Sequence, residues 1–248
     1  MSKLFTIAGL FVVALVVAPV SAQAALVDDD FTGFAGGVIT DVPGWSTSGD
    51  ASAFNIIDTG IAGIGEALQS ATSPCCPNGD RFWTVPGGTT IMNISFDMIS
   101  TGGTSNNGFK FGDNPNQGAA GGGTYLNGFT NGTDWVGNPT DGDGADLGQI
   151  NFGAITIGEI VTLHMDVDGT AGTFSFFMEG PTLGTSSTST FNMGAATMQD
   201  FNLVRWTLGG SNAVIYDNLQ VVIPEPSSIC LLGLGSLMLM LRLRRRRR

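Results

Sequence analysis

The sequence predicts an all-β protein, a jelly-roll-like antiparallel β-sandwich, with a hydrophobic helix at each end of the chain. Two observations predict the sandwich. Apolar and polar residues alternate with a period of two in several segments, and stretches rich in Gly, Asn, Thr and Asp separate these segments. Outside the two ends, no segment sustains the 3.6-residue period of a helix. Many short strands joined by frequent turns are typical of sandwiches and jelly rolls.

Residues 1–24 have the three parts of a secretory signal peptide. Lys3 precedes an apolar run over residues 4–20, and Ala22-Gln23-Ala24 then supplies the small residues of a cleavage site. We expect cleavage after Ala24, which makes Ala25 the first mature residue. An uncleaved membrane anchor is the alternative, but the apolar run is short for a span.

The alternating segments lie in the body, residues 25–222. In 161–168, Val161, Leu163, Met165 and Val167 share one face, and Thr162, His164, Asp166 and Asp168 share the other. This predicts a strand with one buried and one wet face. The same pattern predicts strands at 91–99, 173–179, 200–208 and 213–222, the last with Ile215, Leu219 and Val221 on one side. The sequence DGTAG predicts a hairpin between 161–168 and 173–179.

The charge of the body excludes one class of partner. It holds twenty acidic residues and only three basic ones, Arg81, Lys110 and Arg205, so its net charge is close to −17. A surface of this sign repels nucleic acid and anionic lipid, and we expect no nucleic-acid partner. It is compatible with calcium and with neutral sugars.

Two groups of residues are candidates for ligand binding. Asp141, Asp143 and Asp146 form D-x-D-x-x-D in a glycine-rich loop, and such hard oxygen ligands suit calcium, with plain solvation as the alternative. Trp135 lies in a stretch expected as a polar loop, and Trp83 follows Arg81-Phe82 beside the cysteine pair. An indole ring at either place can stack on a sugar, and packing in the core is the alternative. No certain cofactor follows from the sequence. Cys75 and Cys76 are adjacent and give no long-range disulfide framework.

The sequence gives little support to catalysis. His164 is the single histidine, and no G-x-S-x-G accompanies it. Glycoside hydrolysis needs two neighbouring carboxylates, yet Glu66, Glu159 and Glu179 are far apart in the body, which leaves Asp166 and Asp168 as one acidic pair. We therefore expect a protein without catalytic residues.

The C-terminal end, residues 223–248, has three features in a fixed order. Pro224-Glu225-Pro226 comes first, and a fifteen-residue hydrophobic segment follows. As a helix this segment is about 22 Å long, shorter than the hydrocarbon core of about 30 Å. Six arginines follow, and positive charge stays in the cytoplasm. They are Arg242, Arg244, Arg245, Arg246, Arg247 and Arg248.

This ending resembles the PEP-CTERM sorting signal. The resemblance implies export through the inner membrane, a transient single-pass anchor with a cytoplasmic C-terminus, and an exosortase-type processing enzyme as partner. It also implies delivery to the cell surface or to extracellular polysaccharide and biofilm. It implies nothing about the activity of the body, because unrelated bodies carry this tag.

The body itself resembles laminin-G-like and concanavalin-like jelly rolls. The stretches that carry the resemblance are VTLHMDVDGTAGTFSFFMEG, IYDNLQV and the opening DDFTGF…VPGW. We expect a non-enzymatic structural or adhesive protein of the cell surface or matrix. The alternatives are a carbohydrate-binding module, with or without calcium, and a glycoside hydrolase.

Overall fold

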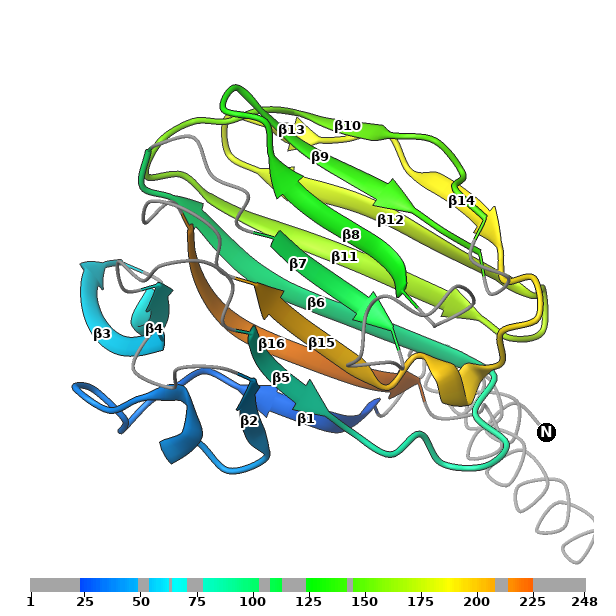
Figure 1. Cartoon of the computed structure of the whole chain (residues 1–248), viewed down its shortest axis with the longest axis horizontal. Coiled ribbons are helices and arrows are strands. Elements are labelled where there is room, and N and C mark those ends of the chain that lie inside the picture. The colour runs from blue at the N-terminus through cyan, green and yellow to red at the C-terminus, as the bar shows by residue number, and fades with distance from the viewer. Residues whose placement is uncertain are drawn as a thin grey trace, which may run out of the picture. The chain divides into compact units, whose positions relative to one another are not determined.

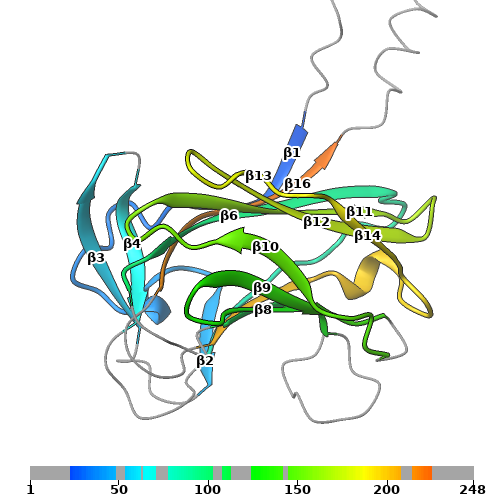
Figure 2. The same ribbon diagram turned by 90° about the horizontal axis from the view of Figure 1, so that it is seen from above.

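The computed structural model describes residues 23–48, 54–62, 64–70, 78–102, 108–112, 124–141, 145–207 and 214–224. A compact unit spans Ala25–Ile223. Within the described residues the strands form two antiparallel sheets, which Figure 2 shows as separate layers. The two expected terminal helices lie outside the described residues. In the described part of the chain, no helix has the length and apolar character that a membrane crossing requires.

Sheet A contains nine strands in the order β13-β12-β11-β6-β16-β4-β3, with β1 beside β16 and β14 beside β12 (Figure 1). Its strands are β1 Gln23–Asp29, β3 Phe54–Ile61, β4 Ile64–Ser70, β6 Ile91–Ser100, β11 Ile160–Asp168, β12 Thr173–Gly180, β13 Gly184–Thr185, β14 Ser189–Asn192 and β16 Val214–Pro224. Because β1 pairs with β16, the first and last strands lie side by side.

Sheet B contains seven strands in the order β10-β9-β8-β7-β15-β5-β2. They are β2 Trp45–Ser48, β5 Asn78–Phe82, β7 Gly108–Gly112, β8 Thr124–Thr130, β9 Asp134–Pro139, β10 Ile150–Ala154 and β15 Leu203–Thr207. In the described part of the chain, two short 3-10 helices, η1 Ile39–Asp41 and η3 Met198–Asp200, lie in connections between strands.

The core lies between the sheets and is rich in aromatic rings. Trp206 of sheet B stacks on Trp45 at 4.5 Å and on Tyr216 of sheet A at 4.8 Å, between ring centroids. Phe96 of sheet A meets Phe109 of sheet B edge-on at 5.3 Å. Gly128 makes room for this packing, because a Cβ atom there would lie 2.0 Å from the ring of Phe109.

The period-2 pattern predicted the central strands correctly. In β11 the side chains of Val161, Leu163, Met165 and Val167 are all buried in the core. The predicted hairpin is present, since β11 pairs with β12 from Thr162↔Glu179 to Asp168↔Thr173. Asp168 Oδ1 accepts hydrogen bonds from the backbone N–H groups of Thr170 and Ala171 and so closes the turn.

Three expectations about the strands were wrong. Ile215 does not share a face with Leu219 and Val221, because a bulge between Asp217 and Gln220, with Asn218 at φ 51°, reverses the alternation of β16. Ile215 therefore packs in a separate small cluster, while Leu219 and Val221 join the main core.

The other two concern the start of β15 and a stretch that was expected as loop. The strand expected at 200–208 starts only at Leu203, because Asp200 Oδ2 accepts hydrogen bonds from Thr197 N and Oγ1 and closes η3 just before it. The stretch around Trp135, expected as loop, contains β9, in which Trp135 and Val136 are buried.

Candidate functional site

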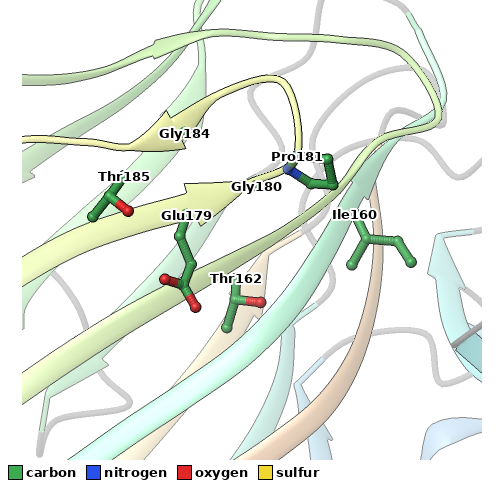
Figure 3. Close-up of a pocket in the computed structure, with 7 residues that line it drawn as sticks. All are labelled: Ile160, Thr162, Glu179, Gly180, Pro181, Gly184 and Thr185. Carbon is green, nitrogen blue, oxygen red and sulfur yellow. The ribbon is translucent and has the colours of Figure 1, made fainter.

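A pocket of about 420 Å³ lies on the outer face of sheet A, at the open end of the β11–β12 hairpin, away from its turn (Figure 3). Thr162 and Glu179 face each other across β11 and β12, and they alternate with Leu163 and Met178, which point into the core. Figure 3 shows the side chains of Thr162, Glu179 and Thr185 gathered along this face. The pocket is lined by Ile160, Thr162, Glu179, Gly180, Pro181, Gly184 and Thr185.

Glu159 holds the turn that forms one wall of this pocket. Its Oε1 atom accepts hydrogen bonds from the backbone N–H groups of Thr182 and of Leu183, the latter at 3.0 Å. Burial by itself raises the pKa of Glu159, but these backbone N–H donors, together with the side chains of Thr156 and Thr182, hold the pKa below the ordinary value. Glu159 is therefore an ionised carboxylate, only 9% exposed, behind the wall of the pocket.

His164 adds a partly exposed aromatic surface next to the pocket. Its ring stacks on Phe177 with centroids 4.5 Å apart and planes 10° apart. Its Nε2 atom lies 3.2 Å from Glu179 Oε1, so one carboxylate both lines the pocket and orients the imidazole. The side chains of His164 and Glu179 are 26% and 51% exposed. The sequence placed His164 on the wet face, but did not indicate this arrangement.

Polar side chains continue from the pocket across the outer face of sheet A. Thr162 Oγ1 donates to Asp97 Oδ1 at 2.6 Å, and Asn218 Nδ2 donates to Asp97 Oδ2 at 2.7 Å. Asn93 Nδ2 donates to Asp166 Oδ1 at 2.5 Å. The carboxylates are thus held by strands that the sequence places far apart. This surface offers hydroxyl, amide and carboxylate groups to a ligand.

A second polar group, on the outer face of sheet B, is buried. Arg205 and Asp80 form a two-pronged ion pair, with Nε–Oδ1 at 2.6 Å and Nη2–Oδ2 at 2.8 Å. Lys110 lies beside Arg205 in register. Burial, and then the charge of Arg205, lower the pKa of Lys110. Arg205 is 3% exposed and Asp80 4%, so we assign this pair a structural role rather than ligand binding.

The two tryptophans expected as sugar platforms are not displayed. Trp135 is 2% exposed and Trp83 is 8% exposed, and both belong to the core. Trp135 lies in β9, where Val136 beside it is buried as well. Trp83 follows β5 directly, where its backbone N–H donates to the carbonyl of Asn202. Neither ring has a face free for stacking on a sugar, and this corrects the sequence-based expectation.

The expected calcium loop is described only in part. Asp141 Oδ1 accepts from the backbone N–H of Ala145 at 2.8 Å, and Asp146 Oδ1 accepts from that of Gly148 at 2.9 Å. Asp143 lies outside the described residues. Among the residues that the structure describes, no three His, Cys, Asp or Glu side chains form a group suited to a metal ion. The calcium expectation therefore stays a prediction.

Most of the expected processing residues lie outside the described ranges. Pro224 is the last residue of β16, and Ala24 lies in β1. The residues of the signal and sorting segments that fall outside are Ala22, Glu225, Pro226, Arg242, Arg244, Arg245, Arg246, Arg247 and Arg248. Cys75 and Cys76 fall outside as well.

Residues 222–248 match the PEP-CTERM protein-sorting motif. The motif implies export, transient anchoring of the C-terminal end in a membrane, and processing by an exosortase-type enzyme. No curated protein sequence matches the chain.

The described sandwich has the fold of lectin-like proteins. It is similar to a carbohydrate esterase from the Shiga toxin-encoding bacteriophage phi24B, with a TM-score of 0.58 and 15% identity, over 82% of this chain and all of that one. Peanut lectin gives a TM-score of 0.53 at 12% identity, over 81% of this chain and 97% of that one. Lotus tetragonolobus seed lectin gives a TM-score of 0.53 at 10% identity, over 82% of this chain and 100% of that one. At these identities the similarity establishes the fold alone.

Proposed function

We propose that this chain is a non-enzymatic, exported protein that binds extracellular carbohydrate and acts as an adhesive or structural component of the cell surface or matrix. The observation that carries the proposal is the pocket on sheet A. It places one carboxylate, Glu179, and two hydroxyls, Thr162 and Thr185, on the outer face of a lectin-like sandwich. Its volume falls in the range that small-molecule and sugar-sized ligands occupy.

The chemistry of the surface suits a sugar. Sugar hydroxyls donate to carboxylates and accept from amides and hydroxyls, and the outer face of sheet A supplies these groups around Asp97 and Glu179. The apolar face of a pyranose packs on a flat ring, and the stacked pair of Phe177 and His164 lies next to the pocket. This pair takes the part that the sequence assigned to Trp83 and Trp135.

Within the described residues, this surface holds no hydrogen-bonded Ser-His pair of the kind that serine hydrolases use. Ser95 lies opposite His164 in register, yet within the described residues no hydrogen bond joins their side chains. His164 Nε2 instead faces Glu179. The sheet also gives no oxyanion donors there, because the backbone N–H groups of a central strand serve the β-ladder. This supports binding without turnover.

The test is a screen of the compact unit Ala25–Ile223, which contains both sheets, against extracellular polysaccharides with and without calcium. Binding that Glu179→Ala weakens, at an unchanged melting temperature, is the expected result. Turnover of the glycan contradicts the non-enzymatic assignment. Failure to bind any glycan overturns the proposed function. Binding that requires calcium makes the Asp141–Asp146 loop the first place to look for the ion.

A further inference from the structure

The charges of the sandwich are divided unequally between the two sheets. All three basic residues of the body lie in sheet B, with Arg81 in β5, Lys110 in β7 and Arg205 in β15. The strands of sheet A contain no lysine or arginine in their sequences. They contain acidic residues in β1, β3, β4, β6, β11, β12 and β16. The sequence shows the acidic excess, but only the topology shows that one sheet lacks basic residues.

The pocket lies within this acidic sheet. Glu179 lines it with a carboxylate that is half exposed, and Asp97 holds the hydroxyl of Thr162 that points along the same face. The ionised carboxylate of Glu159 lies behind the turn Gly180–Gly184, and its Oε2 atom is buried without a hydrogen-bond partner in the described structure. His164 is the one side chain of this group that can carry positive charge, and it contacts Glu179.

We propose that the pocket on sheet A binds a polysaccharide with free amino groups, that is, a chain of cationic amino sugars. This inference rests on the proposed carbohydrate binding and names its ligand class. A protonated amine donates to a carboxylate in a charge-assisted hydrogen bond, and the field of Glu179, Glu159 and Asp97 favours its approach. The same field disfavours uronate-, sulfate- and phosphate-bearing glycans, because like charges across an interface are costly.

The experiment uses the full chain in a mild detergent and two probes of matched length. One is a glucosamine oligomer with free amines, and the other is its N-acetylated counterpart, which is neutral. Affinities are measured by calorimetry at slightly acidic pH, where the amines are protonated, with a chelator present so that no metal bridges ligand and carboxylate. Partly exposed ion pairs have modest energies, so we expect the amine oligomer to bind about threefold tighter or more.

Salt and two charge-removing variants locate the effect. Added salt should shrink the advantage of the amine oligomer. Glu179→Gln keeps the shape of the side chain and should weaken amine binding about two- to fivefold, more than it weakens the neutral oligomer. The matched control is Asp58→Asn on β3, at the opposite edge of sheet A, where Asp58 Oδ1 accepts from the N–H of Gly60. This control should bind like the unmodified chain.

Each outcome decides between the two proposals. Equal affinity for the amine and the neutral oligomer overturns the cationic preference and leaves carbohydrate binding intact. Binding of neither oligomer, together with binding of an acidic polysaccharide, also overturns it. If Glu179→Gln and Asp58→Asn lose equal affinity for the amine oligomer, the whole sheet attracts the amines, and the pocket is refuted as their binding site. Failure of every glycan to bind overturns the proposed function itself.

Discussion

Arg205 and Asp80 face each other across β15 and β5 and form the most buried ion pair of the described structure, with a closest approach of 2.6 Å. Removal of one partner should be costly, because the other charge then stays buried without compensation. We expect Arg205→Met to lower the free energy of unfolding by about 3–5 kcal/mol. Denaturant unfolding of the single variant and of Arg205→Met with Asp80→Leu tests this. A double variant less stable than the single one contradicts the argument.

The two faces of β11 should respond differently to truncation. Leu163→Ala and Met165→Ala each remove buried volume and should cost about 2–5 kcal/mol. Thr162→Ala should cost about 1 kcal/mol, because the hydroxyl of Thr162 donates to Asp97. Thr170→Ala, in the exposed hairpin turn, serves as the control and should stay within about 0.5 kcal/mol. Equal costs at positions 163 and 162 argue against a half-buried strand.

Asp217 should make the sandwich less stable as the pH rises. Burial, and then the charges of Asp97 and Asp30, raise the pKa of Asp217 to about 7. Between the ordinary carboxyl pKa and this value the folded chain binds more protons than the unfolded chain, so the stabilising protonated form is lost as the pH rises to 7. Asp217→Asn should remove this part of the pH dependence and stabilise the chain under alkaline conditions. Thermal unfolding of both chains across this pH range measures the effect. If the stability of the variant falls with pH as steeply as that of the unmodified chain, the prediction is wrong.

Glu159 should have the opposite pH dependence, through the turn beside the pocket. Its pKa is held below the ordinary value, so its contribution to stability is present above the unfolded pKa and is lost as the pH falls. Glu159→Ala leaves the N–H groups of Thr182 and Leu183 without their acceptor and should cost about 1–3 kcal/mol. It should also reduce glycan binding, since Gly180, Pro181 and Gly184 belong to the pocket. A stable variant with full binding contradicts the role of this turn.

The C-terminal tail should be removed from released protein. β16 runs to Pro224, where the matched sorting motif has already begun. Mass spectrometry of surface-released chain should find a C-terminus close to residues 224–228. Recovery of Arg248 on released chain contradicts removal. A variant with Glu225→Ala provides the comparison, because it alters the motif and leaves the described strands unchanged.

The sequence predicted the candidate site only in part. The alternation in 161–168 placed Thr162 and His164 on the wet face of β11, as the structure has them. The contact of Thr162 with Asp97 could not be predicted, because β6 is distant in sequence from β11. The contact of His164 with Glu179 depends on the register of the β11–β12 hairpin, which the alternation alone leaves open. The exposure of the tryptophans was predicted wrongly for a related reason. Polar neighbours along the chain indicated exposure for Trp135, whereas contacts across the sheets bury it.

By itself, the sequence determined what depends on local order along the chain. The period of two determined strands such as β11 and their inward faces, the ending determined the sorting motif, and the composition determined the acidic charge. The tertiary structure alone decided which strands are neighbours, since β6 lies between β11 and β16, and where the bulge at Asn218 reverses a face. It also placed the three lysine and arginine residues of the body in sheet B. Strand pairing joins residues far apart in sequence, and no local pattern records which partner each strand takes.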